Sequence, residues 1–486
     1  MVSKRILQGF LFLNISIFFY GYLVGFGKSL WFDELLSINH ARELNNFSLK
    51  ETFTQHPNSL FYFLLSFVER FFELLNLNPK EDINIIRFIN LIGLIPILFS
   101  YKIIKDEKIQ IDVSILFLLL ISSNYFFNYI LEIRPYFLIL GFAFLISILN
   151  ITDSMEEKYK FLFIFSSIII SIFHIYGLTL SISVLLYRLV VNFYKKNFSR
   201  IKVDIYILFL LLVTFFLIYS LSIFNVEKIP KFTYLKFQLY FISNFIKWNL
   251  NTIFFLIFTS VLIIFIYIRR SSNVYEFFNF FVNKLYLNIL SQIMPIITLL
   301  FVISLVSLMV TPLIHYRYLI VIYPALVLTG GLLTTELLRY YKSKLLFLII
   351  LTIITFVNVN FYLKNIINSE QNIEWVIKKT FNKNCENSEV YFNDNGKDNI
   401  LDSVNKITKI YSKTFRPIKP LSNINLNDLR INKNCKILAF SFHTYDLEKN
   451  LDYLSHQDLK FKIEYAPNVV AKGKSKSGAI VLVENN

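Results

Sequence analysis

The chain has 486 residues, of which 55% are hydrophobic and only 17% are charged. Apolar runs of about 20 residues recur along it, each long enough to cross ~30 Å of hydrocarbon, which excludes a soluble globular protein. The formal net charge of +16 does not indicate nucleic-acid binding, because the lysines and arginines mostly stand at the ends of the apolar runs, as membrane topology signals do.

The first apolar run, residues 6–26, follows Lys4 and Arg5. It resembles a secretory signal sequence, but no small-residue cleavage site closes it and many apolar runs follow. We therefore predict a retained first transmembrane helix. About eleven transmembrane helices are expected in all, at residues 6–26, 85–104, 110–127, 135–150, 161–174, 177–193, 204–224, 251–268, 289–310, 318–337 and 345–362.

Basic residues lie in every second connection between these predicted helices. If the N-terminus is inside the cell, each cytoplasmic connection is basic, as with Lys102, Lys105 and Lys108, or with Lys195 and Lys196. The positive-inside rule therefore predicts a cytoplasmic N-terminus, and an odd number of spans places the tail outside. We expect a multi-pass protein of the plasma membrane.

Three segments are expected outside: 27–84, 225–250 and the tail from about 363. The first outer loop, 27–84, contains an apolar stretch, 60–77, that is interrupted by charges and predicts a helix lying in the membrane interface. In the tail, strand-like runs at 389–392, 436–442 and 479–483 alternate with a helical pattern at 373–381. The expected fold is an all-α polytopic membrane domain over residues 1–362, followed by a small extracytoplasmic α/β domain over 363–486.

Both cysteines, Cys385 and Cys435, fall in this tail. Outside the cytoplasm they can form a disulfide that closes a loop of roughly 50 residues. Two unpaired buried thiols are an equally good interpretation, and the sequence leaves both open.

Ionisable and polar residues gather at the predicted outer ends of the helices. Ionisable groups at membrane depth are expensive and are usually retained for function. The set comprises Asp33 and Glu34 after Trp31-Phe32, His56 before Pro57, Glu132 and Arg134, His174 and Tyr176, and His315, Arg317 and Tyr318.

Each of these residues also has a purely structural explanation. Asp33 can cap the N-terminus of a helix over 35–44, with Glu34 in its first turn. His56 can stand at the start of a helix, His174 can be a satisfied core histidine, and the arginines can reach to lipid phosphates. Because the topology places all of them on the same side, we favour a shared pocket.

The chemistry of this set suits group transfer from a lipid phosphate. A carboxylate beside an apolar wall can act as a general base, and arginines are well shaped to bind phosphate with two hydrogen bonds. The sequence has no Walker-type loop, no glycine-rich nucleotide fingerprint and no zinc motif with credible spacing. The energy for the transfer must therefore come with the donor.

Short motifs over residues 1–360 resemble, in order, those of the GT-C membrane glycosyltransferases, in particular the branch of protein O-mannosyltransferases and lipid A aminoarabinose transferases. Two positions depart from the family's pattern: Asn58 replaces the second proline of the His-Pro-Pro segment, and Ile175 intervenes in the His-Tyr turn. The motifs are Trp31-Phe32-Asp33-Glu34, His56-Pro57-Asn58-Ser59-Leu60-Phe61-Tyr62, Glu132-Ile133-Arg134-Pro135-Tyr136, His174-Ile175-Tyr176-Gly177, and Arg317-Tyr318 followed by Pro324.

This resemblance implies an inverting transfer of a sugar from a polyprenyl-phosphate donor, at the outer membrane surface, to a glycan, lipid or protein acceptor. Asp33 would be the base, Glu34 a polar support or metal contact, and Arg134 and Arg317 the ligands of the donor phosphate. A divalent metal is a possible cofactor. The implied substrate-binding residues are His56, Tyr62, Glu132, Tyr136, His174, Tyr176 and Tyr318.

Two other functions remain as alternatives. A transporter or flippase of lipid-linked glycans would have ionisable groups along a path through both leaflets, whereas here they cluster on the outer side. A polysaccharide ligase or polymerase of similar architecture would place its chemistry on a large late outer loop, whereas the loop at 311–317 is short.

Overall fold

The computed structural model divides into two compact units. The first unit comprises Met1–Tyr22, Asn46–Leu64 and Arg87–Asn360, and the second comprises Leu23–Asn45, Leu65–Ile86 and Phe361–Asn486. The structure describes residues 4–26, 30, 32–44, 59–77, 79, 83–151, 157–218, 239–240, 242–247, 249–270, 284–309, 317–341, 344–369, 372–382, 385, 388–393, 400–412, 416–421, 435–442, 447, 460–466 and 478–484.

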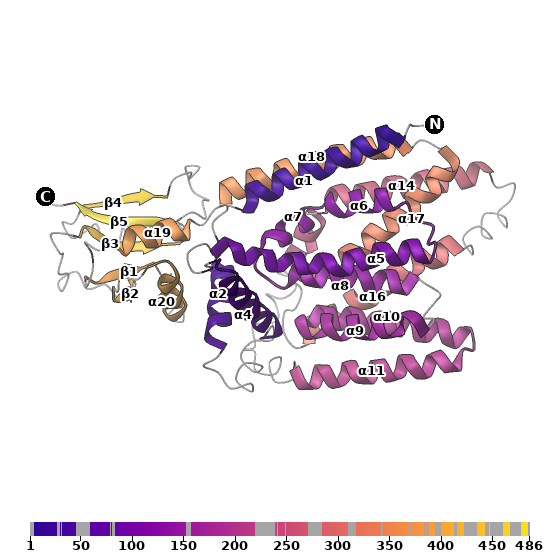
Figure 1. Ribbon diagram of the computed structural model, residues 1–486, viewed down its shortest axis with the longest axis horizontal. Coiled ribbons are helices and arrows are strands. Elements are labelled where there is room, and N and C mark those ends of the chain that lie inside the picture. The colour runs from indigo at the N-terminus through magenta and orange to yellow at the C-terminus, as the bar shows by residue number, and fades with distance from the viewer. Residues whose placement is uncertain are drawn as a thin grey trace. The chain divides into compact units, whose positions relative to one another are not determined.

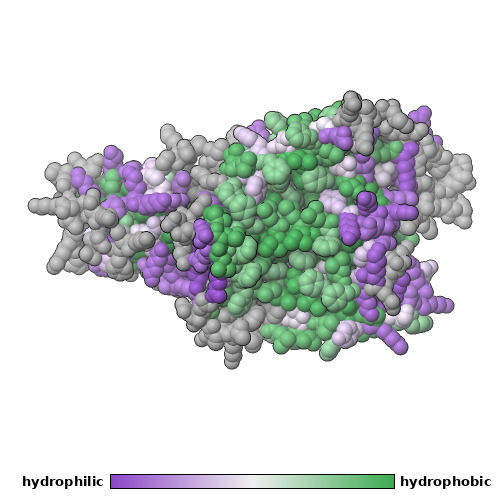
Figure 2. Space-filling model, viewed as in Figure 1, coloured by the Kyte–Doolittle hydropathy of each residue, from purple (hydrophilic) through white to green (hydrophobic). Residues whose placement is uncertain are grey.

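The first unit is built from long helices, and consecutive ones pack side by side, as α8, α9, α10 and α11 do (Figure 1). A wide hydrophobic surface covers the face of these helices that Figure 2 shows, as expected where lipid replaces water as the solvent. The helices are α1 (Lys4–Phe26), α5 (Leu94–Asp106), α6 (Val113–Ile121), α7 (Asn124–Leu131), α8 (Tyr136–Ile151), α9 (Glu157–Phe173), α10 (Ile175–Tyr194), α11 (Phe198–Ile218), α14 (Leu250–Arg270), α16 (Lys284–Met309), α17 (Tyr323–Tyr341) and α18 (Lys344–Ser369), with the 3-10 helices η2 (Ile83–Gly93) and η3 (Tyr318–Ile322).

Among the described residues, six helices are long and apolar enough to cross a membrane, or seven if the bent pair α6 and α7 forms one span. A helix lies over each of the eleven predicted ranges, but the count of eleven spans is not confirmed. Two reasons are visible: α8 and the apolar part of α14 are short, and α11 begins with Arg200, Lys202 and Asp204 in its first two turns.

The predicted single span 110–127 is instead two helices, α6 and α7, bent by 67° relative to each other. One local and one long-range hydrogen bond stabilise the break. The Oγ of Ser123 accepts a hydrogen bond from the Tyr125 amide at 3.0 Å and so begins a new helix. The side-chain amide of Asn358 in α18 donates to the carbonyl of Ser122. This bond satisfies a carbonyl that has no partner within the helix where the helix breaks.

Helices α5 and α8 approach each other closely because glycines stand at the contact. A Cβ added to Gly141 would collide with the backbone oxygen of Gly93, and one added to Gly93 would lie 2.7 Å from the backbone oxygen of Phe137. Small residues commonly permit this close approach between membrane helices. The contact fixes η2 and the start of α5 against α8.

At one end of the first unit, polar contacts join three connections between helices. Lys158 Nζ lies 3.3 Å from Glu107 Oε1, and Lys344 Nζ lies 2.5 Å from Asp112 Oδ2. Arg339 also contacts the side chain of Gln110. Hydrophilic surface gathers at this end, on the right in Figure 2, where α5 ends and α9 begins. Three of the connections predicted to be cytoplasmic therefore lie together.

Between α10 and α11 an ion pair is buried. Arg188 Nη2 donates to Asp204 Oδ1 at 2.9 Å, and Asn192 Nδ2 donates to Asp204 Oδ2 at 2.8 Å. The Asp204 side chain is fully buried, and the Arg188 guanidinium also lies 4.9 Å from the centre of the Phe163 ring. Both carboxylate oxygens are thus satisfied within the bundle.

Replacing Asp204 with alanine is expected to destabilise the protein by about 3–5 kcal/mol, because it leaves the Arg188 charge buried without its partner. The double substitution Arg188→Met/Asp204→Leu should restore most of this loss, since it removes both charges. The measurement is unfolding in micelles as a function of denaturant. Equal destabilisation by both variants would show that packing, and not the unpaired charge, accounts for the loss.

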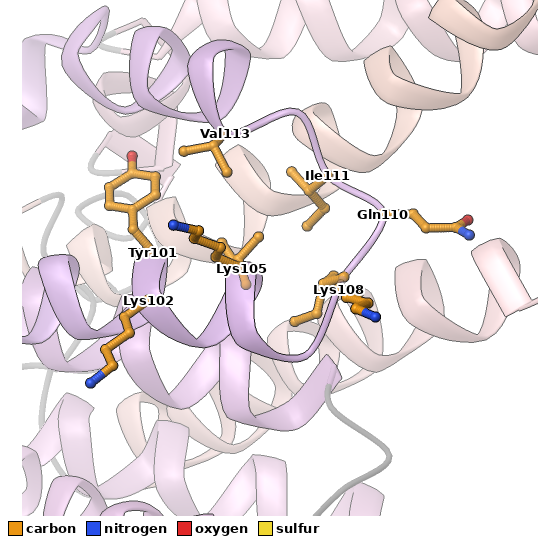
Figure 3. A pocket seen from close by; sticks show the side chains of 9 residues that line it. Tyr101, Lys102, Lys105, Lys108, Gln110, Ile111 and Val113 are labelled. Atoms are coloured by element: carbon orange, nitrogen blue, oxygen red, sulfur yellow. The ribbon is translucent and has the colours of Figure 1, made fainter.

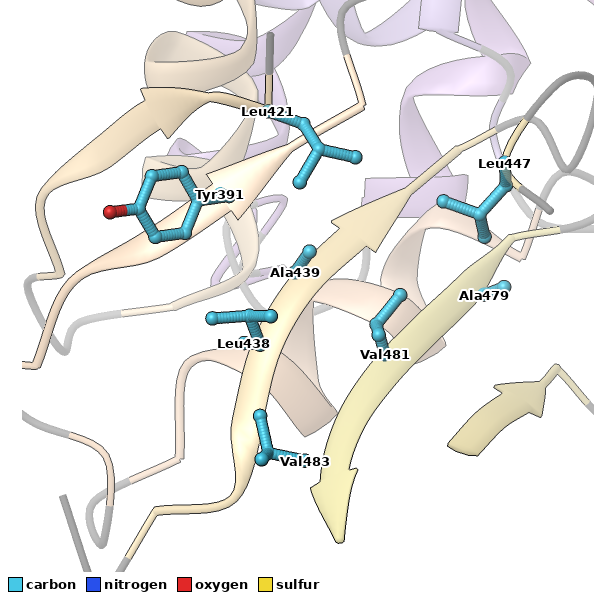
Figure 4. Close-up of a cluster of buried hydrophobic side chains, with 8 residues drawn as sticks. All are labelled: Tyr391, Leu421, Leu438, Ala439, Leu447, Ala479, Val481 and Val483. Atoms are coloured by element: carbon cyan, nitrogen blue, oxygen red, sulfur yellow. The ribbon is translucent and has the colours of Figure 1, made fainter. Parts of the chain in front are cut away.

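The second unit contains a five-stranded sheet in the order β2-β1-β3-β5-β4. Strands β1 (Val390–Phe392), β2 (Ile418–Pro420) and β3 (Ile437–Ser441) run parallel, whereas β5 (Ala479–Glu484) is antiparallel to β3 and to β4 (Lys460–Tyr465). The helices of the tail are α19 (Ile373–Thr380) and α20 (Ile400–Tyr411). The three strand segments predicted in the tail and its predicted helix are therefore present. One hydrophobic cluster packs on the sheet (Figure 4): Tyr391, Leu421, Leu438, Ala439, Leu447, Ala479, Val481 and Val483.

Two further features stabilise this unit. A disulfide joins Cys385 and Cys435, which resolves the alternative left open by the sequence, and it contributes about 4 kcal/mol by the chain-entropy model. Arg416 donates hydrogen bonds of 2.8–2.9 Å to the carbonyl oxygens of Thr380, Ser388, Glu389 and Ile437. It thereby ties α19 and the segment before β1 to β3.

Part of the segment predicted to be the first outer loop, residues 27–84, belongs to this second unit. Helix α2 (Phe32–Glu43) packs against α20, and the C-terminal part of α4 (Ser59–Leu74) also lies in the unit. In α4, Leu65 and Val68 are buried, whereas Phe67, Phe71 and Leu74 are exposed. An exposed apolar face of this kind agrees with the predicted interfacial helix.

Candidate functional site

Residues from three distant chain segments meet at one end of the first unit. The segments are the connection between α7 and α8, the turn between α9 and α10, and the start of η3. The His174 ring centre lies 4.6 Å from that of Tyr318 and 6.2 Å from that of Tyr136. Because successive helices alternate in direction, this end is opposite the one where Lys158 and Lys344 form ion pairs. We call the group Glu132, Arg134, Tyr136, His174, Tyr176, Arg317 and Tyr318 the arginine–tyrosine cluster.

The charged part of the cluster contains two arginines and one carboxylate. Arg317 Nη1 lies 3.8 Å from Glu132 Oε1, and both side chains are largely buried. The Arg134 guanidinium lies 5.9 Å from the centre of the Tyr136 ring, in a cation–π contact. The described residues of the cluster thus carry one positive charge more than negative charge, in a partly buried setting. Such a site favours an anion.

The backbone around Glu132 is held in place by a tight turn and by a neighbouring asparagine. The Arg134 amide donates to the Glu132 carbonyl at 2.7 Å. From η2, the side-chain amide of Asn90 donates to the carbonyl of Glu132 at 2.7 Å and to that of Ile130 at 3.1 Å. These bonds satisfy backbone groups where α7 has ended and α8 has not begun. The hydrogen bonds thus hold the short connection that carries both Glu132 and Arg134.

His174 has a structural role in the turn between α9 and α10. Its Nδ1 accepts a hydrogen bond from the Tyr176 amide at 3.2 Å, which caps the N-terminus of α10. Nδ1 therefore lacks a proton, and the neutral ring carries its proton on Nε2. A Cβ on Gly177 would collide with the carbonyl of Ile170, so the glycine permits the close turn. The interpretation of His174 as a satisfied core histidine agrees with this geometry.

Asp33 and Glu34 belong to the second unit and lie in the first turn of α2. Since α2 begins at Phe32, Asp33 lies inside the helix, and the structural alternative in which it caps a helix over 35–44 does not hold. Both carboxylates remain favourably placed, because negative charge is stabilised near a helix N-terminus. Glu34 is fully buried, whereas Asp33 is half-buried.

Ion pairs hold α2 within the second unit. Arg42 Nη2 lies 2.5 Å from Glu69 Oε1 in α4, and Lys406 Nζ in α20 lies 3.4 Å from Glu43 Oε2. Burial lowers the pKa of the Lys406 amine, but the carboxylates of Asp402 and Glu43 outweigh it and hold that pKa above its usual value. The helix that carries Asp33 is therefore braced at its C-terminal end by the tail.

Some predicted residues lie elsewhere or are not described. Tyr62 is buried in the part of α4 that belongs to the first unit. Trp31, His56 and His315 lie outside the described residues.

Sequence reasoning missed three buried polar residues of the first unit. Asn90 positions the Glu132 backbone, and Arg87, on the same 3-10 helix, is fully buried. Tyr129 stacks on Tyr125 and meets Tyr136 edge-on, and its hydroxyl has no hydrogen-bond partner among the described residues. An arginine within an apolar run was a usable signal, because such residues are costly in a membrane. Nothing in the sequence distinguished Asn90 or Tyr129 from the many other asparagines and tyrosines.

In the described part of the chain, no group of three His, Cys, Asp or Glu side chains is arranged to hold a metal ion. The arginine–tyrosine cluster contains a single carboxylate, that of Glu132, beside its aromatic and basic side chains. Comparisons of the whole chain with protein-family models, with curated proteins and with solved structures found no match in any of the three.

Proposed function

We propose that this protein is an integral membrane glycosyltransferase of GT-C type that transfers a sugar from a polyprenyl phosphate to an acceptor hydroxyl on the extracytoplasmic side. In this proposal the chain has eleven spans and a cytoplasmic N-terminus. The observation that carries it is the convergence of the arginine–tyrosine cluster. Its members belong to successive sequence motifs spread over nearly 190 residues, and they meet at one end of the first unit.

The cluster has the chemistry that a phosphate leaving group requires. Arg317 and Arg134 are the cations, and arginine binds phosphate oxygens through two parallel hydrogen bonds. Glu132 lies 3.8 Å from Arg317 and would hold the guanidinium in place until the donor phosphate binds. The surrounding rings of Tyr136, Tyr176 and Tyr318 exclude water, which strengthens electrostatic interactions with the donor.

The proposed reaction is a single displacement with inversion. Asp33 accepts the proton of the acceptor hydroxyl as the hydroxyl oxygen attacks the anomeric carbon of the donor sugar. The bond from that carbon to the phosphate oxygen breaks, and polyprenyl phosphate leaves with the bonding electron pair. Arg134 and Arg317 stabilise the negative charge that develops on the leaving phosphate. Glu34 supports α2 beside the base, and a divalent metal remains a possible cofactor.

A transporter would use ionisable groups along a continuous path. The described ionisable residues favour the transferase over a transporter, because the Arg188–Asp204 pair is satisfied within the bundle and does not connect to the arginine–tyrosine cluster.

The test is donor consumption by the purified protein in liposomes. The probes are polyprenyl phosphates that carry one hexose or one pentose, with extracted envelope glycans, lipids and proteins as acceptors. We expect polyprenyl phosphate to be released only when an acceptor is present, and nucleotide sugars to give no product. Movement of the intact lipid-linked sugar across the bilayer without release of polyprenyl phosphate would overturn the proposal and support a flippase.

A further inference from the structure

A hollow of about 860 Å³ lies at the end of the first unit opposite the arginine–tyrosine cluster. Its size is in the range of pockets that bind small molecules. It is formed by the last turns of α5 and by the connection to α6, and Figure 3 shows Lys105 extending into it from α5, with Ile111 and Val113 on the facing side. The residues that line it are Tyr101, Lys102, Ile104, Lys105, Lys108, Ile109, Gln110, Ile111 and Val113.

The lining combines three amines with an apolar wall. Lys102 and Lys105 are exposed, and the described residues place no carboxylate within ion-pair distance of them or of Lys108. None of the three acidic residues of this part of the chain, Asp106, Glu107 and Asp112, lines the hollow. Glu107 is paired with Lys158, and Asp112 with Lys344. The hollow therefore has a net positive charge that the described part of the protein does not neutralise.

The basic side of the hollow continues into a lipid-facing stripe. Ile95, Leu98, Lys102 and Lys105 follow one another at spacings of three, four and three residues, so they lie on one face of α5. Ile95 and Leu98 are 52% and 65% exposed. This face is thus apolar along the helix and basic where the helix ends, which matches the acyl chains and the phosphate of a membrane lipid.

We propose that this hollow binds the headgroup of an anionic glycerophospholipid of the cytoplasmic leaflet. The phosphate lies among the amines of Lys102, Lys105 and Lys108, and the acyl chains lie along Ile95 and Leu98. Basic pockets between membrane helices on the cytoplasmic side commonly recognise anionic lipids in this way. The site is independent of the proposed transferase reaction, because it lies at the other end of the bundle.

The test compares two triple variants by native mass spectrometry after equilibration with equal amounts of phosphatidylglycerol and phosphatidylcholine. Lys102→Gln/Lys105→Gln/Lys108→Gln removes the amines of the hollow. Lys195→Gln/Lys196→Gln/Lys202→Gln removes the same charge at the same end but outside it. The two triple variants are also matched in backbone conformation, because each replaces one lysine with a positive φ: Lys108 at 48° and Lys196 at 55°.

We expect the wild type and the second triple variant to retain phosphatidylglycerol preferentially, and the first to lose this preference by roughly 10- to 100-fold. Equal losses in both variants would overturn the proposal, because they would reflect general surface charge. Displacement of the lipid by an excess of inorganic phosphate would also overturn it, in favour of a free phosphate site. If the triple variant does not fold, Lys105→Gln alone should still lower the preference several-fold, and an unchanged preference would reject the site.

Discussion

Replacement of Asp33 with asparagine is expected to lower the rate constant of sugar transfer by about 100- to 10,000-fold, the usual contribution of a positioned general base. Asparagine has the same shape but cannot accept the proton of the acceptor hydroxyl. Its effect on stability should be small, below about 1 kcal/mol, because asparagine keeps the shape of the side chain while one favourable charge is lost at the N-terminus of α2. The measurement is a single-turnover assay of donor consumption in liposomes.

The matched control for Asp33→Asn is Glu73→Gln, which removes an exposed carboxylate from α4 in the same unit. Glu73→Gln should transfer sugar at the wild-type rate. Wild-type turnover by Asp33→Asn would exclude Asp33 as the base, even if the protein proved to be a transferase. A loss of activity shared by both variants would indicate that the charge of the second unit, and not one base, affects the rate.

Replacement of Arg317 with glutamine is expected to lower kcat/KM for the donor by roughly 30- to 1,000-fold. It removes the guanidinium from the buried charge pair that Arg317 is proposed to form with the donor phosphate. The loss should be larger for the donor than for the acceptor, since the guanidinium is proposed to bind only the donor phosphate. Arg317→Lys should recover part of the activity, as lysine keeps the charge but not the paired hydrogen bonds. Initial rates over a series of donor concentrations measure these effects.

Arg339→Gln is the control for this prediction, because Arg339 stands near the opposite end of the same helical segment, η3 followed by α17, where its partner is Glu336. It should leave KM for the donor unchanged. If Arg317→Gln changes KM for the acceptor and leaves KM for the donor unchanged, the assignment of the phosphate to this arginine is wrong. Arg134→Gln then becomes the variant that tests the donor site.

The sequence by itself determined the class of the protein and the positions of its elements. Long apolar runs with basic ends predict membrane helices wherever they occur, because the pattern depends only on local composition. A helix lies over each predicted range, and β1, β3 and β5 lie where strand-like runs predicted them, whereas β2, β4 and α20 were not predicted. The grouping of Glu132, Arg134, His174 and Arg317 at one end also follows from sequence, since alternating helix direction brings every second connection together.

Other features depended on the tertiary structure, because they arise from contacts between segments far apart in the chain. The bend after α6 is stabilised by Asn358, more than 200 residues away, and no local pattern encodes such a partner. No local pattern encodes the partner of Asn90 either, because its side-chain amide can donate to the carbonyl of Glu132 only where η2 packs against the segment following α7. The division into units is also tertiary: α2 belongs with the tail because its side chains meet α20, as in the pair Glu43 and Lys406. Hydrophobic periodicity reports which face of a segment is buried, but not which distant segment buries it.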